Sequence, residues 1–373
     1  MPGHQELAKH VLSWITCAKR PLAAPEIQHA WAVRDSGDEL DEDSLPEIEE
    51  MVSVCAGLVT IDHDGGILRL VHYTTQEYFE QTLDTSLPNA HFEIAKTCAS
   101  YLSFSTFSGG SSFGNPWFGM LLEANPLYYY AACNWGHHAR EAANLPDEVL
   151  DFLQSDGGNV DAANEALCAH KEPSRWDLED ATGKVRGLHL AAHFGLESAT
   201  AELLAAGYDP NMTDSRNRTP LFYAAKQGHV DVVRVLLATG KVDVNVANDW
   251  HSTPVYEACN NNHPAVVQAL LDSGQADVEK RTFWGRGFTP LETAVTEGHE
   301  AAVRVLLDSK LVDVNATDGI NGRTILGHAK CWHRSAIAQL LRAHGARDVD
   351  GSEDGNEDED GEKDKVGNGE KDE

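Results

Sequence analysis

Residues 219–237 read TPLFYAAKQGHVDVVRVLL, and this stretch decides the fold of most of the chain. Shorter versions of it return three times downstream, and a degenerate version precedes it at residues 187–192. The marker residues of the five copies are separated by steps of 33, 34, 36 and 35 residues: Leu188, Leu221, Val255, Leu291 and Leu326. A series of Leu-Leu pairs follows the marker residues with a similar period, at residues 203–204, 236–237, 270–271, 306–307 and 340–341. Two series of near-constant period predict a solenoid of stacked units.

Each copy contains the start and stop signals of two short helices. Thr-Pro favours a helix start, because the Thr hydroxyl can cap the helix and Pro is tolerated in its first turn. A glycine then predicts a left-handed helix end in three of the copies, at Gly195, Gly228 and Gly298. Asn262 stands at that position in the third copy and His333 in the last. A second helix carries Val-Val-x-x-Leu-Leu, and Asp-Val-Asn leads into a hairpin before the next unit.

This pattern resembles the ankyrin repeat, and residues 219–237 match the family motif almost in full. The resemblance covers five units over residues 180–348. It implies binding of a protein partner through the hairpin tips and the concave helix face, without catalytic residues. It also implies that His189 hydrogen-bonds the adjoining hairpin. The degenerate first and last units are expected to be end-capping units.

Composition and charge narrow the classes of partner. The chain of 373 residues has a net charge of −30. Basic and acidic residues number 5 and 16 over residues 1–85, 4 and 10 over 86–176, 17 and 21 over 177–349, and 3 and 12 over 350–373. No segment is basic, which argues against direct binding of nucleic acid. Residues 349–373 are rich in Asp, Glu and Gly, and we expect a disordered acidic tail.

The sequence lacks the signals of a membrane protein and of the main enzyme classes. No stretch approaches the roughly 18 apolar residues that span a bilayer, and no secretory signal is present. Seven scattered cysteines without a Cys-x-x-Cys pair suggest reduced thiols, so we expect a cytoplasmic or nuclear protein. No nucleophile elbow or metal-ligand cluster occurs. We therefore expect no enzymatic activity, cofactor, metal or small-molecule substrate.

The first 85 residues predict a second, smaller domain. Helices are expected over residues 5–18, from Pro25 through Trp31, and over 44–55, with Ser44 and Glu47 forming a capping box. Two strands follow, at 58–61 and 67–71, and a further helix starts near Thr74. Three helices, a β-hairpin and a closing helix indicate a winged-helix domain. The expected third helix has Glu47, Glu49 and Glu50 but no Lys or Arg, which excludes it as a DNA-reading helix.

Residues 71–79, VHYTTQEYF, are similar to the His-x-Ser/Thr-x-Gln-Glu-Tyr/Phe signature of the winged helix in NACHT proteins, the NLR-like signalling ATPases. Residues 7–32 are similar to the winged helix of filamentous-fungal NACHT–ankyrin proteins. Residues 126–139 are similar to the helical linker of that family, so 86–176 are expected to form a helical connector. In the family, the signature His helps to hold ADP against the ATPase module, which implies that role for His72 if such a module is present.

The chain itself contains no GxxxxGK[S/T] phosphate loop, since both of its Gly-Lys pairs are followed by Val. Two possibilities follow: a naturally shortened relative, or the C-terminal part of a longer signalling ATPase. A third possibility is a nuclear transcription coregulator that acts through protein contacts.

The hairpins hold the best candidates for partner binding. Most hairpins take ten residues from Asp to Thr, but the fourth takes twelve, from Asp277 to Thr289. Aromatic and basic residues gather in the third and fourth hairpins, as at an interface hot spot. The candidates there are Trp250, His251, Phe283, Trp284, Arg286 and Phe288, with Tyr223 and Trp332 as lesser candidates on the helix face.

Together these patterns predict a mostly α fold in which a winged helix, a helical connector and an ankyrin solenoid follow one another. The predicted function is non-enzymatic: a scaffold, adaptor or regulatory protein that binds a protein partner of unknown identity.

Overall fold

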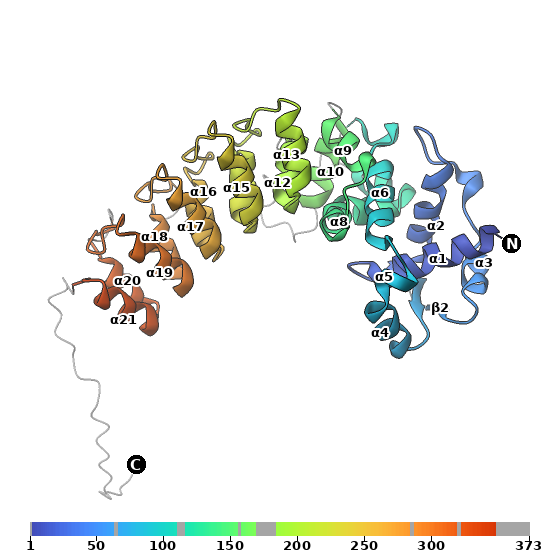
Figure 1. Cartoon of the computed structure of the whole chain (residues 1–373), viewed down its shortest axis with the longest axis horizontal. Helices are drawn as coiled ribbons and strands as arrows, with labels where there is room; N and C mark the ends of the chain where they lie inside the picture. Colours follow the sequence, from blue (N-terminus) through green and yellow to red (C-terminus); the bar gives the residue numbers. More distant parts are fainter. Residues whose placement is uncertain are drawn as a thin grey trace, which may run out of the picture.

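The computed structural model describes residues 2–62, 66–109, 116–155, 158–168, 184–283, 287–318 and 322–347. Helices dominate, and the chain forms a curved row of helices from its N-terminal end to the fifth repeat unit (Figure 1). The predicted tail at 349–373, Trp284 and Arg286 lie outside the described residues. None of the helices in the described part of the chain is both long and apolar enough to cross a membrane.

The N-terminal part has the order of elements expected of a winged helix. It runs α1 (Pro2–Cys17), β1 (Leu22–Ala23), α2 (Ala24–Ala32), α3 (Ile48–Val54), β2 (Val59–Asp62) and β3 (Ile67–Leu70). The three strands form an antiparallel sheet in the order β1-β3-β2, with Leu22 opposite Leu68 and Val59 opposite Leu70. The apolar faces of the three helices and the sheet share one core, which includes Val11, Trp14, Ile27 and Met51.

Two details of this part differ from the sequence prediction. The strand β1 was not predicted, because two residues are too short to show a strand period. The third helix begins at Ile48, so the prediction that Ser44 caps it is wrong. Ser44 ends a short 3₁₀ turn, and its hydroxyl donates to Asp41 instead. Pro46 is the physical reason, since the residue before a proline is driven out of the helical region.

Within the described residues, seven α-helices lie between the sheet and the repeat units. They are α4 (Tyr73–Gln81), α5 (Leu83–Ser86), α6 (Ala90–Leu102), α7 (Pro116–Ala124), α8 (Leu127–Glu141), α9 (Asp147–Gln154) and α10 (Gly158–Cys168). The helices α6 and α8 pack closely, and bury a group of large aromatic side chains: Tyr101, Tyr128, Tyr130 and Trp135. Because α1 and α2 also contact α6 and α8, the core continues across residue 85. The domain boundaries at 85 and 176 stay predictions.

A glycine lets the connector meet the first repeat at short range. A Cβ atom on Gly136 of α8 would overlap Cγ of Phe194. The Phe194 ring packs against Trp135, with ring centroids 4.9 Å apart. The Tyr208 hydroxyl also donates to the carbonyl of Gln154, at the end of α9. The connector therefore forms the first layer of the stack.

Five helix pairs lie where the sequence predicts five repeat units. They are α12 (Gly187–Phe194) with α13 (Glu197–Ala205), α14 (Pro220–Gln227) with α15 (Val230–Ala238), α16 (Pro254–Asn260) with α17 (Pro264–Asp272), α18 (Pro290–Glu297) with α19 (Glu300–Ser309), and α20 (Ile325–Cys331) with α21 (Ser335–Ala343). First helices pack on first helices of the next unit, and second helices on second helices. Alanines such as Ala191 and Ala224 are fully buried, so the small residues allow close stacking.

The predicted caps are present. The hydroxyls of Thr219, Thr253, Thr289 and Thr324 each accept a hydrogen bond from the backbone N–H three residues later. Gly195, Gly228 and Gly298 have φ of 74°, 80° and 85°, and Asn262 and His333 take the same region at 57° and 54°. Close packing adds a second demand for glycine, because a Cβ on Gly228 would lie 2.5 Å from Nδ1 of His263.

The last unit differs from the predicted Leu-Leu ladder by one residue. Leu341 is fully buried whereas Leu340 is partly exposed, so Leu341 is the equivalent of Leu306. The backbone bonds that start α19 and α21, Val303 to His299 and Ala338 to Arg334, give the same offset. The sequence analysis aligned Leu340 and Leu341 with the earlier Leu-Leu pairs because the residue types match. Burial instead makes Leu341 and Arg342 the equivalents of Leu306 and Leu307.

Candidate protein-interaction surface

The hairpins of the repeat units lie along one edge of the solenoid, and each is closed by a backbone hydrogen bond. Residues 214 and 218, 248 and 252, 282 and 288, and 318 and 323 form these bonds, at 3.0, 3.1, 3.1 and 2.8 Å. The turn closed by residues 282 and 288 is the longest, which agrees with the insertion predicted in the fourth hairpin. Its residues 284–286 lie outside the described part of the chain.

A polar side chain at the base holds the backbone of each of the two shorter tips. The Asp214 carboxylate accepts hydrogen bonds from the N–H groups of Arg216 and Arg218, both at 2.9 Å. Asn248 accepts in the same way from Trp250 and Ser252, at 3.0 and 2.9 Å. These contacts fix the direction in which each tip leaves the solenoid.

An ion pair between Asp214 and Arg218 also stabilises the base of the first tip. Burial would raise the pKa of Asp214, but Arg218 and the hydrogen bonds at the carboxylate together lower it. The Arg218 guanidinium lies 2.6 Å from Asp214, and both side chains are almost fully buried. His189 completes this base, since it accepts from the N–H of Arg186 and contacts the Met212 carbonyl in the hairpin. The structural role predicted for His189 is confirmed.

Neighbouring tips are joined to one another. The N–H of Asp249 donates to the carbonyl of Arg216 at 3.2 Å, and the N–H of Phe283 donates to the carbonyl of Trp250 at 2.8 Å. The Asn217 amide donates to the Asp249 carboxylate at 2.7 Å. These bonds join the described residues of the three tips along one edge.

Four side chains of this edge form what we call the tip cluster: Arg216, Trp250, His251 and Phe283. The guanidinium carbon of Arg216 lies 5.0 Å from the centre of the Trp250 ring, a cation–π arrangement. The rings of His251 and Phe283 are 5.8 Å apart. Trp250 is half-buried, while Phe283 is 77% exposed. A large aromatic ring this exposed, beside a pre-ordered Trp and Arg, is the composition of an interface hot spot.

A polar groove adjoins the tip cluster. Its volume is about 550 Å³. Its lining includes Asn217, Asn245, Asp249, His251 and Lys280. The Lys280 ammonium group donates to the carbonyl of Asn245 at 3.1 Å, which holds its positive charge at the wall. An extended segment with polar groups would find both donors and acceptors here.

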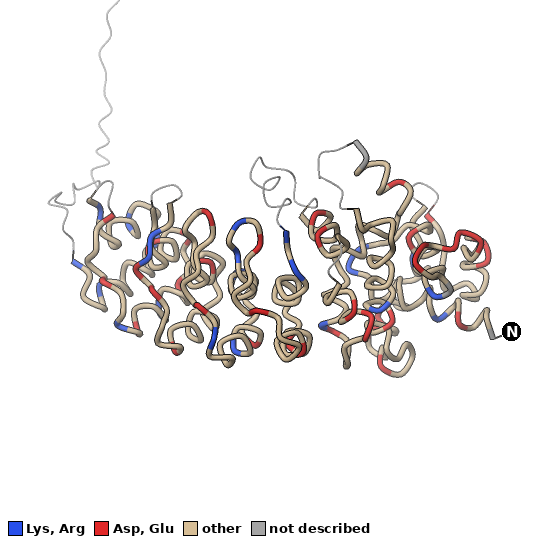
Figure 2. The backbone as a smooth tube through the Cα atoms, turned by 90° about the horizontal axis from the view of Figure 1, so that it is seen from above, with Lys and Arg blue, Asp and Glu red and all other residues tan. Residues whose placement is uncertain are grey.

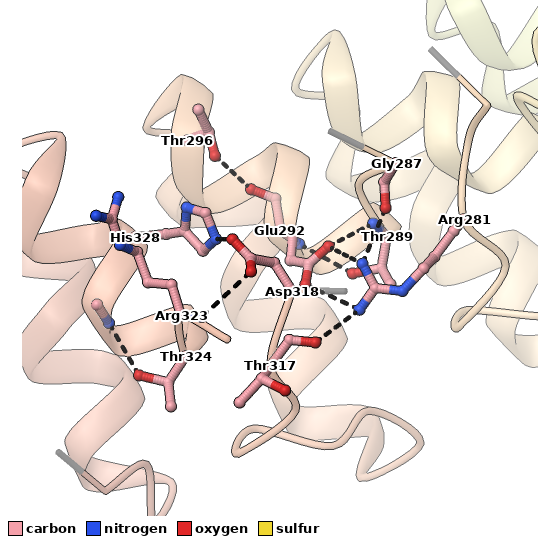
Figure 3. A network of polar contacts seen from close by, with 11 residues as sticks. Arg281, Gly287, Thr289, Glu292, Thr296, Thr317, Asp318, Arg323, Thr324 and His328 are labelled. Atoms are coloured by element: carbon pink, nitrogen blue, oxygen red, sulfur yellow. Dashed lines mark hydrogen bonds and ion pairs between the residues drawn. The ribbon is translucent and has the colours of Figure 1, made fainter. Parts of the chain in front are cut away.

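A partly buried polar network joins the long hairpin to the elements beside it (Figure 3). The Arg281 guanidinium donates to both oxygens of Glu292, at 2.8 and 3.1 Å, and to the carbonyls of Gly287 and Thr317. Glu292 is 1% exposed and also accepts from the N–H of Thr289. Arg281 therefore ties the fourth hairpin to α18 and to the fifth hairpin.

The remaining predicted residues do not join the tip cluster. Phe288 packs edge-on against His328, at 5.5 Å between centroids. Tyr223 is buried, and its hydroxyl donates to Asp214, so it offers little surface to a partner. Trp332 is 49% exposed at the end of α20 that points away from the hairpins. Trp284 and Arg286 lie outside the described residues.

His72 lies far from the hairpins, on the winged helix. It is exposed at the start of α4, and its Nδ1 is 3.3 Å from the Thr74 hydroxyl. Over the described residues, no group of three or more His, Cys, Asp or Glu side chains is arranged to hold a metal ion.

Sequence reasoning missed two residues of the surface, Arg216 and Arg281. Alignment of the second and third hairpins could have identified Arg216, because it follows Asp214 by two residues, just as Trp250 follows Asn248. No sequence signal marks Arg281, since its partner Glu292 lies eleven residues away and they meet only through the hairpin fold.

Comparison with protein families matches both halves of the molecule. Residues 188–282 match the family model described as ankyrin repeats (3 copies), and 286–319 match that of a single ankyrin repeat. Residues 2–94 match the winged-helix domain of GPI inositol-deacylase. The chain thus carries ankyrin repeats behind a winged-helix domain, as the sequence motifs indicated.

Proposed function

We propose that this ankyrin-repeat protein with an N-terminal winged helix is a scaffold, adaptor or regulatory protein that binds a protein partner through the tip cluster. Ankyrin repeats serve protein–protein interaction in general, and their architecture is typically non-catalytic. The single observation that carries the proposal is the 77% exposed Phe283 beside a Trp250 ring held under Arg216. Exposing such a ring to water is unfavourable unless a partner covers it.

Pre-organisation supports the same surface. Hydrogen bonds between neighbouring hairpins hold the backbone at residues 216, 249, 250 and 283, so a partner would not have to order these positions on binding. Less conformational entropy is then lost in the complex, and more of the contact free energy appears as affinity. The adjoining groove supplies Asp249 and Lys280 for polar contacts around the apolar centre.

The test compares partner capture by three full-length proteins. The first is the wild type, the second carries Trp250→Ala with Phe283→Ala, and the third carries Trp332→Ala. The control removes an exposed aromatic ring at the opposite edge of the solenoid. Partners are captured from cells, quantified by mass spectrometry, and the Kd of each reproducible partner is then measured with purified protein.

We expect the double variant to weaken partner binding by roughly 2–4 kcal/mol, the range for hot-spot truncations, while Trp332→Ala leaves it within a factor of two or so. Equal binding by the double variant and the wild type would overturn the assignment. Loss of binding in Trp332→Ala alone would move the interface to the other edge.

A second function is favoured by the exposed apolar face around His72. Val71, which follows β3, and Tyr73 and Tyr78 of α4 are 56%, 71% and 57% exposed. Tyr73 also lines a depression of about 410 Å³, together with Lys19, Arg20, Arg69 and His72 among others. This face would suit contact with an ATPase module, and the chain would then be the C-terminal part of a NACHT-type signalling ATPase.

Mapping the full transcript and the mass of the native protein tests the second function. An in-frame upstream segment with a phosphate loop would make His72 a candidate nucleotide sensor. A native protein whose N-terminus is Met1 would count against it, and the interaction function at the hairpins would stand alone.

A further inference from the structure

A further groove lies between the winged-helix part and the connector, away from the tip cluster. Its volume is about 610 Å³, which falls within the range of roughly 300–1,000 Å³ that is usual for ligand sites. The lining comes from the segment that follows α2, from one face of α6, and from α9. We call it the acidic groove.

Negative charge exceeds positive charge in the acidic groove. The charged residues of its lining are Arg34, Lys96, Asp38, Glu93, Glu148 and Asp151. Both cations have partners, since Lys96 lies 3.0 Å from Glu148 and Arg34 lies 3.2 Å from Glu6. The carboxylates of Asp38, Glu93 and Asp151 have no ion pair with any described residue. Three negative charges of the lining are therefore left without a cation.

A buried hydroxyl in the same groove also lacks a partner. Thr97 lines the groove and is 8% exposed, and its hydroxyl makes no hydrogen bond within the described part of the chain. A helical Ser or Thr can donate to the carbonyl four residues back, as Ser103 does to Ala99 at 2.8 Å. A buried hydroxyl without such a bond costs free energy, and a ligand that bonds to it would recover that cost. Thr97 therefore points to a polar ligand, independently of the carboxylates.

The segment that lines one side of the groove is held in place. The Ser36 hydroxyl donates to the carbonyl of Ala32, the last residue of α2, at 2.8 Å. The N–H of Ser105 donates to the carbonyl of Asp38 at 2.9 Å. A ligand would find these positions already ordered, which lowers the entropy lost on binding.

The charge of the surroundings favours a basic ligand. Residues 1–176 carry 26 acidic and 9 basic side chains, and acidic positions are frequent towards the N-terminal end (Figure 2). The pKa of Lys96 is raised, chiefly by its hydrogen bond to Glu148 and further by the charges of Glu93 and Asp147, although burial opposes the rise. A surface of one sign of charge attracts ligands of the opposite sign.

We propose that the acidic groove binds an arginine-containing segment of a partner polypeptide. A guanidinium has five N–H donors and no acceptor, so it can donate to carboxylates and to a hydroxyl at the same time. The groove offers the carboxylates of Glu93 and Asp151 and the hydroxyl of Thr97 as acceptors. Val33 and Phe104, which are also part of the lining, give apolar surface for the aliphatic stem of the arginine. Among the described residues, no three carboxylates are gathered as ligands of a metal ion.

The proposal goes beyond the interaction at the hairpins and does not depend on it. The tip cluster lies on the repeat units, whereas the acidic groove lies on the winged-helix part and the connector. Substitutions in one surface leave the other intact, so either assignment can fail alone.

The test measures binding of a synthetic peptide that alternates Arg with Gly and Ser to the full chain by isothermal titration calorimetry. A second peptide has citrulline in place of each Arg, which keeps the shape of the side chain but removes its charge. The groove variant carries Glu93→Gln with Asp151→Asn. The matched control carries Glu197→Gln with Glu202→Gln on α13, where both residues are exposed and the change in net charge is the same. Glu93 and Glu197 both lie in the first turn of their helices, so the effect on the helix dipole is also matched.

We expect the groove variant to bind the Arg peptide roughly tenfold more weakly than the wild type, because two ionic contacts are lost. The control should bind it within a factor of about two of the wild type, and the citrulline peptide should bind weakly to all three proteins. Equal losses in the groove variant and the control would mean that the peptide responds only to net charge, which would overturn the proposal. Failure of the wild type to bind the Arg peptide at about millimolar concentration would overturn it as well. Thermal unfolding of all three proteins checks that the variants are folded.

Thr97→Val gives an independent readout, because it removes the hydroxyl and leaves the charge and the shape of the side chain. We expect it to weaken binding of the Arg peptide by about threefold or more, since a hydrogen bond to the guanidinium is lost. The stability of the free protein should be unchanged or higher, because this hydroxyl has no partner to lose. A loss of stability without a change in binding would show that the hydroxyl is structural, and would overturn its role in the groove.

The methyl NMR signal of Thr97 separates the groove from other acidic parts of the chain. The signal is identified by its absence in Thr97→Val. In chains labelled at the threonine methyl groups, the Arg peptide should shift it in the wild type and in the control but not in the groove variant. Spermidine is the competing probe: if it shifts the signal at a lower concentration of positive charge than the Arg peptide does, the groove is a site for a free polyamine and the proposal is wrong.

Discussion

The Nδ1 atoms of His91 and His138 lie 2.9 Å apart, and this hydrogen bond joins the start of α6 to α8. The chain of contacts continues in both directions. His91 Nε2 lies 3.2 Å from Glu141, while the Tyr130 hydroxyl lies 2.8 Å from His138 Nε2 and accepts from the N–H of Lys19 at 3.1 Å. One assignment of protons satisfies every member: both imidazoles are neutral, and His138 donates to His91. The contacts tie the winged helix to the connector.

This pair predicts a loss of stability in acid. Burial lowers the pKa of His138 from 6.5 to about 2, and burial also lowers the pKa of His91. A His whose pKa is lower in the folded state binds fewer protons folded than unfolded at intermediate pH. The neutral His therefore contributes fully to the stability of the folded state above pH 6.5, and this contribution is lost as the pH falls below that value.

His138→Gln removes one such group. Between pH 6 and 4.5 we expect the unfolding free energy of the variant to fall less steeply, by about 1.4 kcal/mol per pH unit. Urea unfolding at a series of pH values measures both slopes, and equal slopes would refute the assignment.

Gly228→Ala tests the close contact between the second and third units. The alanine would have a left-handed backbone and a Cβ atom 2.5 Å from the His263 ring. Gly240→Ala is the control, since Gly240 also has a positive φ, of 64°, but no atom lies within 4 Å of the added Cβ. The control should lose about 1 kcal/mol from backbone strain, and Gly228→Ala about 1–3 kcal/mol more from overpacking. Chemical denaturation gives both values, and similar losses would show that the His263 ring moves aside freely.

The Arg281–Glu292 pair should behave as a partly buried ion pair, because the Glu292 side chain is 1% exposed and that of Arg281 is 35% exposed. Arg281→Met leaves the Glu292 carboxylate buried without its partner, for which we expect a loss of about 1–3 kcal/mol. The double variant Arg281→Met with Glu292→Met should lose less than the sum of the single variants, because no unpaired charge remains. Arg304→Met is the exposed control: its ion pair with Glu300, at 2.9 Å, should contribute at most about 0.5 kcal/mol. A double-mutant cycle of unfolding free energies measures the coupling. If the loss in the double variant equals the sum of the losses in the single variants, the two side chains do not stabilise each other.

Gly136→Ala tests whether the connector forms the first layer of the stack. The added methyl group would overlap the Phe194 ring, and we expect a loss of about 1–3 kcal/mol. Gly119→Ala, in α7 and with open space around its Cβ, should be neutral or stabilise by up to about 1 kcal/mol. Both are measured by denaturation followed through tryptophan fluorescence. Tolerance of Gly136→Ala without any loss would show that the connector and the first unit can separate at little cost.

The sequence by itself determined the repeated elements. The helix starts at Thr-Pro, the left-handed helix ends and the period of 33 to 36 residues are signals carried by short stretches of sequence. The five units, their caps and the ankyrin resemblance could therefore be predicted from the sequence. The winged helix was also predicted, because its apolar periods and the signature around His72 lie within short stretches. The prediction that Ser44 caps the third helix was wrong, because Pro46 keeps the residue before it out of the helical conformation.

Only the tertiary structure decided which side chains meet. The placement of Arg216 over Trp250, of Phe288 against His328, and of Tyr223 against His189 depends on contacts between residues of neighbouring units, about 34 to 40 positions apart in the sequence. Such contacts leave no period in the sequence. The shift of the last Leu-Leu pair is of the same kind, since only burial shows that Arg342 stands at a stacking position. Local propensity sets the elements, whereas the neighbours of a side chain are set by packing across the whole solenoid.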